Sequence, residues 1–400
     1  MSDDPRDEGL NVLVPHHARA DVIRRLSRRQ ALALGGAGAL SLYLAACGGS
    51  SGGGGSDEEQ AASDKPSVPT DAKVEDQLLI ANWVDYSDPA NYKTFTKVNG
   101  AKISIDGYGS NEELLTKLNA GGSRFDIVAP TGYAVKTMID KGQALKLNRE
   151  LLPNLKNLQD KFTKTEYDPG NAYSIPKDYG VTSFYWRTAV VKEDPKTLRE
   201  AFDLMAKYKD ARVNVLEGGT QLSAVALAAL GYSINSEDQG ELDEAKELLI
   251  SVKPSIDTIS STFIPRGEKG EIDFGIGWNG DVARIIAARA KKDDEVKFLI
   301  PDGKTEYWVD NWVIPAEARH PVAAHRWLNQ MLDPKYAARE TEYHQYAVPV
   351  KGVENLADKA IVGNPIIYVD EAKIATYETQ VQTPKGQTMR DRAYTEFKAA

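Results

Sequence analysis

Apolar positions follow a regular pattern from residue 77 onward, in which short apolar runs alternate with stretches of helical spacing. The runs LLIA and IVA are short enough for buried strands, and the stretches between them repeat apolar residues every three or four positions, as surface helices do. We therefore expect strands at 77–86, 101–108 and 125–130, and helices at 88–100, 110–122 and 132–142. This order predicts an α/β lobe with a largely parallel sheet.

The same pattern returns in the second half of the chain. The segments 211–232 and 272–290 each indicate a strand, a glycine-containing turn and a helix. Further strands are expected within 179–191 and 307–316, and helices within 320–332, 370–380 and 389–400. The roughly 350 residues beyond the N-terminal region are enough for two lobes with separate cores.

The N-terminus has the layout of an export signal. Residues 31–46 carry no charge, follow two arginine pairs, and are too short for a membrane-spanning helix. Arg28 and Arg29 resemble a twin-arginine signal, and the sequence ending at Cys47 resembles the lipobox of bacterial lipoproteins. We expect a signal peptide over 1–46 and a lipid on Cys47. The alternative is a buried anchor helix with an incidental cysteine.

A glycine- and serine-rich stretch follows this cysteine. Residues 47–76 contain few apolar side chains, so they are expected to form a flexible tether rather than a core. Two acyl chains hold a protein stably on a membrane. The folded part would then work outside the cytoplasm, in the periplasm or at the outer face of the cell membrane.

The composition narrows the class of protein. Hydrophobic residues make up 42% of the chain and charged residues 27%, which are values of a globular protein. With one cysteine no disulfide can form within the chain, and the five histidines lack the spacing of a metal site. The net charge of −9 argues against a nucleic-acid partner. We expect neither a metal nor a cofactor.

Aromatic and acidic residues occur together where the predicted strands end. Ligands of parallel sheets bind beyond the carboxyl ends of the strands. Those positions hold Trp83, Asp85, Tyr86, Thr131, Tyr133, Glu217, Trp278, Asn279, Trp308 and Asp310. Singly, each ring could serve lobe packing and each acid could cap a helix, as Asp88 and Asp281 could. Their occurrence together at nearly every expected strand end favours a binding site.

These two residue types suit a cation. Aromatic faces attract ammonium groups by about 0.5–1 kcal/mol when exposed and by about 2 kcal/mol or more when desolvated. Carboxylates pair with the same groups. A slot of Trp and Tyr faces with acids at its ends therefore fits an elongated cation with an apolar middle. An anion at the glycine-rich helix start after Glu217 is a competing hypothesis, but the carboxylate of Glu217 would repel it.

Six segments, taken in order, carry a family resemblance: LLIANWVDY, SNEELLTKL, FDIVAPTGYAV, YSIP, IGWNG and YWVDNWVIPA. They resemble the bacterial spermidine/putrescine-binding proteins, the solute receptors of polyamine ABC importers. The resemblance implies a type II periplasmic-binding-protein fold, in which crossing strands join two α/β lobes around a ligand cleft. Lobe 1 would comprise 77–182 and 311–353, and lobe 2 would comprise 183–310 and 354–400.

The resemblance also implies a pocket. Asp85 and Asp310 would receive ammonium groups, and the rings around the methylene chain would be Trp83, Tyr86, Tyr133, Trp278 and Trp308. Thr131 and Gln380 would complete this set. Where the family has two carboxylates three residues apart, this chain offers Glu217 and the amide of Gln221. That departure slightly favours a shorter diamine or a related monocation over spermidine.

The resemblance finally implies a monomer that closes around its ligand, docks on ABC permease subunits and is held on the membrane through Cys47. It would catalyse no reaction. Two other classes stay open. One is a binding protein for a different small solute, such as another amine, an amino acid, a sugar or a small anion. The other is a secreted two-lobed hydrolase, although the sequence has no His-Glu-x-x-His motif.

Overall fold

The computed structural model describes residues 68–120, 125–292, 294–381 and 383–400. The predicted export signal at Arg28 and Arg29 and the predicted lipidation site at Cys47 lie outside these residues. Within the described part of the chain, no helix has the length and apolar character needed to cross a membrane.

A mixed sheet has the strand order β2-β1-β3-β9-β4-β7-β5-β6, with β8 paired to β4. The strands are β1 (Gln77–Trp83), β2 (Lys102–Tyr108), β3 (Ile127–Val128), β4 (Ser174–Arg187), β5 (Val213–Val215), β6 (Ile256–Ile259), β7 (Phe274–Trp278), β8 (Val296–Phe298) and β9 (Glu306–Val313). β1 is parallel to β2 and β3, and β5 is parallel to β6 and β7. Between these groups, β4 and β9 run antiparallel to their neighbours.

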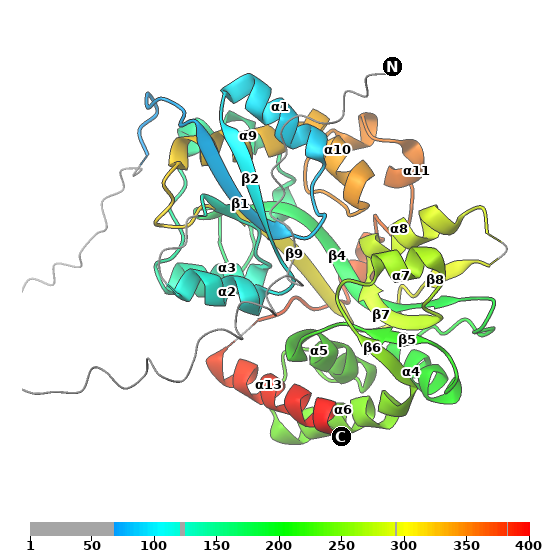
Figure 1. Ribbon diagram of the computed structural model, residues 1–400. Coiled ribbons are helices and arrows are strands. Elements are labelled where there is room, and N and C mark those ends of the chain that lie inside the picture. The colour runs from blue at the N-terminus through cyan, green and yellow to red at the C-terminus, as the bar shows by residue number, and fades with distance from the viewer. Residues whose placement is uncertain (1–67, 121–124, 293, 382) are drawn as a thin grey trace, which may run out of the picture. The chain divides into compact units, whose positions relative to one another are not determined.

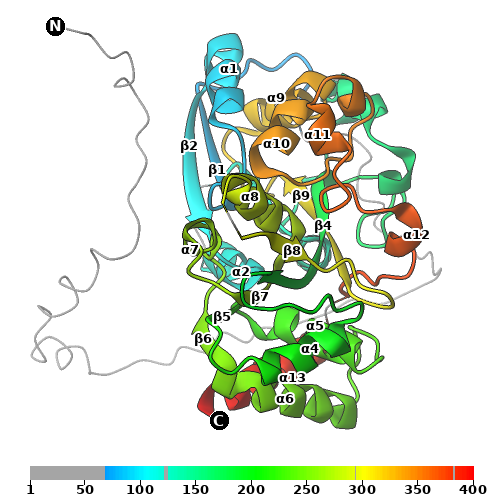
Figure 2. The same ribbon diagram turned by 90° about the vertical axis from the view of Figure 1, so that its right-hand side faces the viewer.

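Helices cover both parallel groups of strands. They are α1 (Pro89–Asn99), α2 (Asn111–Asn119), α3 (Gly132–Asp140), α4 (Leu198–Lys207), α5 (Gly219–Ala229), α6 (Gln239–Val252), α7 (Ile264–Lys269), α8 (Asn279–Arg289), α9 (Pro321–Met331), α10 (Pro334–His344), α11 (Lys359–Val362), α12 (Glu371–Ile374) and α13 (Pro384–Ala399). Figures 1 and 2 show α1 and α9 beside β1 and β2, and in the other group α4 and α5 pack on β4 while α6 and α13 pack against α5.

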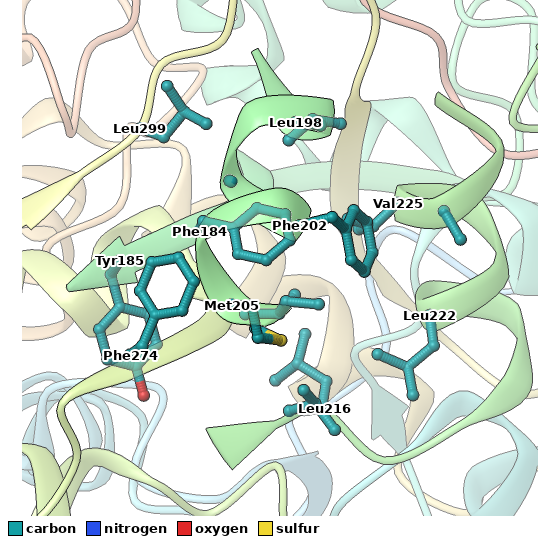
Figure 3. Packing of buried hydrophobic residues seen from close by; sticks show 14 of the residues in the cluster. Phe184, Tyr185, Leu198, Phe202, Met205, Leu216, Leu222, Val225, Phe274 and Leu299 are labelled. Carbon is teal, nitrogen blue, oxygen red and sulfur yellow. The ribbon is translucent and has the colours of Figure 1, made fainter. Parts of the chain in front are cut away.

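Each parallel group has its own apolar core. In one core, the ring of Phe184 on β4 lies 5.0 Å from Phe202 of α4 and 5.7 Å from Phe274 of β7, as centroid distances (Figure 3). In the other, Trp327 of α9 meets Trp312 of β9 at 5.9 Å. Such ring pairs contribute about 0.5–1.5 kcal/mol each beyond the area they bury. The two cores thus pack independently around the central strands.

The central pair β4 and β9 carries polar residues on one buried face. The facing pairs are Asp178 with Asp310, Gly180 with Trp308, and Thr182 with Glu306. Because side chains alternate along a strand, these pairs share a face of the sheet. Gly180 is needed there, since a Cβ at this position would lie 2.5 Å from the indole of Trp308. This face forms the floor of the site described below.

One predicted helix is much shorter than expected. The sequence 370–380 forms only the single turn of α12, because the residues after it run beside β9. Tyr307 donates a backbone hydrogen bond of 2.9 Å to Glu378, and the N–H of Glu378 donates one of 3.0 Å to Thr305. Pairing with the sheet therefore overrides the helical pattern at 376–380.

The last residues of the predicted tether pack on the fold. Val68 is 3% exposed and packs in a small cluster with Leu151 and Val322. The carboxylate of Glu75 accepts backbone hydrogen bonds from Val322 at 3.2 Å and Ala323 at 2.7 Å, in the first turn of α9. These N–H groups have no partner within the helix, so Glu75 caps it. Val68 and Glu75, placed in the tether by composition, thus belong to the folded part of the chain.

Replacing Glu75 by Ala should lower the free energy of unfolding by about 1 kcal/mol, because α9 loses two capping hydrogen bonds. Urea unfolding of residues 66–400 measures this loss. Asp71→Ala, at a nearby exposed acid, is the control and should leave the unfolding midpoint unchanged. Equal midpoints for the two variants would contradict the capping role of Glu75.

Candidate ligand-binding site

A cavity of about 370 Å³ lies at the carboxyl ends of β1, β3 and β7. This volume is within the range of small-molecule sites. Eight of the eleven residues predicted as ligand contacts line it: Trp83, Asp85, Tyr86, Thr131, Gln221, Trp278, Trp308 and Asp310. Residues far apart in the sequence are thus brought to one cavity, as the rule for strand ends predicts. Their contact with a ligand stays a prediction.

Five rings form one cluster at this cavity. Tyr86, Trp308 and Tyr346 are buried, and Trp83 and Trp278 pack against them. Ring centroids are 5.4 Å apart for Tyr86 and Tyr346, and 5.1 Å apart for Trp308 and Tyr346. Trp83 and Trp278, the last residues of β1 and β7, meet edge to face at 6.3 Å. The cluster provides an aromatic wall for a ligand.

Hydrogen bonds fix the two partly exposed indoles. Trp83 donates a hydrogen bond of 2.9 Å from Nε1 to the backbone oxygen of Ala129. Trp278 donates one of 3.0 Å from Nε1 to the side-chain oxygen of Gln221. The amide of Gln221 therefore orients an aromatic wall residue from α5. Rings held in this way lose little further freedom when a ligand binds.

The buried acid Asp310 lines the cavity, its strand neighbour Asp178 lies beside it, and the phenol oxygen of Tyr86 lies between the two carboxyl groups. It is 2.7 Å from Oδ1 of Asp178 and 3.0 Å from Oδ2 of Asp310. Thr131 donates a hydrogen bond of 2.6 Å to the other oxygen of Asp310. Asn111 in turn donates one of 3.0 Å to the hydroxyl of Thr131. The loop after β3 thus fixes the carboxyl group of Asp310.

Lys177 lies beside the same acids. Its ammonium group forms an ion pair with Asp178 and donates a hydrogen bond of 3.0 Å to the backbone oxygen of Tyr86. The same group lies 3.7 Å from the centre of the Tyr86 ring, and the Lys177 side chain is 2% exposed. The chain therefore builds an ammonium–aromatic contact of its own next to the cavity.

Burial and the neighbouring charge of Asp178 raise the pKa of Asp310 to about 7. Burial also raises the pKa of Asp178. The hydroxyl group of Tyr86 has one proton and can donate to only one of the two carboxyl groups. The other carboxyl group forms a hydrogen bond with this hydroxyl only when it carries a proton of its own and donates it. Burial thus favours a protonated carboxyl group in this pair, and Asp310, with a pKa of about 7, is only partly ionised at neutral pH.

Asp281 supplies a further acid in the first turn of α8. Its Oδ1 accepts a hydrogen bond of 2.6 Å from the hydroxyl of Tyr346, and burial raises its pKa to about 6. Trp278, not Asp281, occupies the N-cap position of α8. Asp88 does cap α1, where it accepts a hydrogen bond of 2.8 Å from Ala90. Of the two acids considered as caps, Asp281 thus faces the cavity instead.

Three of the residues predicted as ligand contacts do not line the cavity. Tyr133 is buried at the start of α3, where its hydroxyl accepts a hydrogen bond of 2.9 Å from Asn111. Glu217 is exposed at the end of β5. The side-chain amide of Gln380 is buried, and its two polar atoms have no hydrogen-bond partner among the described residues. Local sequence patterns gave no indication of these orientations.

The sequence-based prediction missed several residues of the site, namely Asp178, Lys177, Asp281, Arg284 and Tyr346. It considered only the ends of strands, whereas Lys177 and Asp178 lie within β4. Two adjacent charges inside a strand with many apolar residues were the available signal, because buried charges need a partner. Tyr346 lies in the loop after α10 and carries no comparable signal.

The arrangement is suited to binding. Rings, buried acids and hydroxyl groups converge on one cavity and offer both apolar contact and charge pairing. Across the residues that the structure describes, no group of three His, Cys, Asp or Glu side chains is placed to hold a metal ion.

Comparison with known proteins gives a family. Residues 90–366 match the model of the family described as bacterial extracellular solute-binding protein. The putrescine-binding periplasmic protein SpuD of Pseudomonas aeruginosa is 31% identical over 343 residues, which cover 80% of this chain and 92% of that protein. The putrescine-binding periplasmic protein PotF of Escherichia coli is 31% identical over 350 residues, or 83% and 94% of the two chains.

A solved structure shows the same architecture. The spermidine/putrescine ABC transporter substrate-binding protein PotD of Streptococcus pneumoniae superimposes with a TM-score of 0.69 at 25% identity, covering 81% of this chain and 99% of that one. This similarity confirms the predicted type II periplasmic-binding-protein fold with two α/β lobes.

Proposed function

Because the chain belongs to the bacterial extracellular solute-binding protein family, we propose that it captures a polyamine of the putrescine/spermidine class outside the cytoplasm and delivers it to an ABC permease. The family consists of binding proteins, so the chain is not an enzyme. One observation carries the proposal: five aromatic rings and the acids Asp281 and Asp310 surround a single cavity.

This geometry matches the chemistry of a polyamine. Aromatic faces attract a desolvated ammonium group by about 2 kcal/mol or more, and they pack equally well on methylene groups. Asp281 and Asp310 can each accept charge-assisted hydrogen bonds from an ammonium group. Asp281 contacts Tyr346, Tyr346 packs on Tyr86, and Tyr86 contacts Asp310. Aromatic rings thus separate the two acids, and the cavity suits a cation charged at both ends.

The ligand would be captured by closure of the two lobes. We place lobe 1 at 77–182 with 311–353 and lobe 2 at 183–310 with 354–400, and the two separate cores support this division. Trp83 would contribute from the first lobe and Trp278 from the second. A ligand that contacts both stabilises the closed arrangement, because those contacts are complete only there.

The protein would act as a monomer held at the membrane. The cysteine Cys47 would carry the lipid, and the signal around Arg28 and Arg29 would direct export. The relatives SpuD and PotF are named as periplasmic proteins, which supports a place outside the cytoplasm. The permease subunits would be its protein partners.

Isothermal calorimetry of residues 66–400 at about pH 8 tests the proposal. Putrescine, spermidine, spermine and agmatine would be compared with γ-aminobutyrate and glucose as controls that lack a second cationic group or any charge. At least one polyamine should bind with micromolar affinity or better, and the controls should show no heat of binding. Binding of a control solute in the absence of polyamine binding would overturn the proposal.

Polyamine affinity should rise with pH up to about 7 and then level off. The carboxyl group of Asp310, with a pKa of about 7, is protonated below that pH, and a proton must leave before an ammonium group can pair with it. One released proton changes the affinity by at most about tenfold per pH unit. Calorimetry at several values between about pH 5.5 and 8.5 measures the trend. A constant affinity over this range would mean that the ligand does not pair with Asp310.

A further inference from the structure

Asp85, a predicted ammonium acceptor, already has a cationic partner within the chain. Nη2 of Arg284 on α8 lies 2.7 Å from Oδ2 of Asp85, and Nη1 lies 3.4 Å from the backbone oxygen of Asp85. Tyr343 of α10 donates its hydroxyl proton to the other carboxylate oxygen. Both oxygens of Asp85 are therefore engaged.

Arg284 is held firmly in this position. Its side chain is 20% exposed, and its guanidinium lies 5.8 Å from the ring centre of Tyr343. Asp85 has a φ of 59°, a backbone conformation that Asp adopts more readily than most residues. Hydrogen bonding to Asp85 and the nearby charges of Asp85 and Asp281 outweigh burial and raise the pKa of Arg284. Arg284 is a permanent cation at the edge of the cavity.

Of the charged residues that line the cavity, Asp85 and Arg284 form an ion pair. Among the described residues, the charged ones in this lining are Asp85, Glu268, Asp281, Arg284 and Asp310. Arg284 neutralises Asp85, and Glu268 is exposed to water. Asp281 and Asp310 remain, both facing the cavity and each in contact with a ring of the aromatic cluster. Two carboxyl groups in contact with the aromatic cluster are thus available for two ammonium groups.

We propose that Arg284 determines specificity. Its guanidinium pairs with Asp85, the acid that a third ammonium group would need, so the cavity accepts a diamine and disfavours a triamine. This inference rests on the proposed polyamine function. A third ammonium group would have to displace a bidentate guanidinium from Asp85 or lie close to a like charge. A diamine needs only Asp281 and Asp310, so it leaves the ion pair of Arg284 with Asp85 intact.

The test compares putrescine and spermidine in calorimetric titrations of the wild type and of Arg284→Gln. The wild type should bind putrescine more tightly than spermidine. In Arg284→Gln the ratio of the two dissociation constants should shift by about tenfold or more toward spermidine, because Asp85 becomes free for a third ammonium group. Arg284→Lys retains the cation and should retain the preference for putrescine. Melting temperatures of all variants verify folding.

Arg199 provides a matched control, since it pairs with Asp203 at 3.1 Å on the exposed face of α4. Arg199→Gln should leave both affinities unchanged. An unchanged ratio of the two dissociation constants in Arg284→Gln would overturn the inference while polyamine binding stood. If both affinities also fell by the same factor, Arg284 would instead help to close the mouth of the cavity. Absence of polyamine binding to the wild type would refute the proposed function itself, and this inference with it.

Discussion

Asp310→Asn is expected to weaken polyamine binding about tenfold or more at about pH 8, where the wild-type carboxyl group is ionised. The substitution keeps the shape of the side chain and removes its negative charge. A charge-assisted hydrogen bond to a desolvated ammonium group is lost, and such bonds are about twice as strong as neutral ones. Titration calorimetry with the tightest-binding polyamine measures the effect.

Asp140→Asn is the matched control for this variant. Asp140 forms an exposed ion pair with Lys136 on α3 and does not line the cavity, so its replacement should leave the affinity unchanged. Asp310→Asn should also bind with little dependence on pH between about 7 and 8, since the carboxyl group of Asp310 is gone and Asp281, with a pKa of about 6, is ionised there. An affinity equal to that of the wild type would show that Asp310 does not receive the ligand.

Trp278→Ala is expected to weaken polyamine binding about thirtyfold, which corresponds to about 2 kcal/mol for a desolvated cation–π contact. The indole ends β7, is partly exposed at the cavity and packs on the aromatic cluster. Its removal opens the wall of the cavity on one side. Calorimetry gives the affinity, and tryptophan fluorescence during titration shows whether an indole senses the ligand.

Trp278→Phe separates the loss of a ring from the loss of the indole N–H. The phenyl group keeps an aromatic face but cannot donate to Gln221, so its affinity should lie between those of the wild type and Trp278→Ala. Gln221→Ala should produce a small effect of the same sign, because it only frees the indole. An unchanged affinity in Trp278→Ala would remove this ring from the proposed site.

Much of the fold could be predicted because its signals are local. The cap of α2 is an example: Ser110 followed by Glu113 predicts a helix start, and Ser110 accepts a hydrogen bond of 3.1 Å from the N–H of Glu113. β7 runs opposite to β1 and β3, and the carboxyl ends of these strands face one another over the middle of the β4–β9 pair, so Trp83, Thr131 and Trp278 reach one cavity. Apolar periodicity and the rule for parallel strands were enough for this part.

What could not be predicted depends on contacts between distant segments. Asp178 and Asp310 are 132 positions apart along the sequence and become neighbours only through the register of β4 and β9. The pairing of Asp85 with Arg284 requires α8 to lie against the loop after β1. Gln380 was predicted as a ligand contact, yet the structure encloses it where 376–380 runs beside β9. Local patterns of residue type along the sequence do not indicate contacts between segments that are far apart in the chain.

The buried ammonium group of Lys177 affects the protein before any ligand arrives. Two carboxylates enclosed in the sheet without a counterion would repel each other and would strain the pairing of β4 with β9. The ion pair of Lys177 with Asp178 offsets one of these negative charges, and the raised pKa of Asp310 lets a proton offset the other. Lys177 and a proton can therefore neutralise the two acids that β4 and β9 bring together, so the sheet pairs at this point without an uncompensated charge.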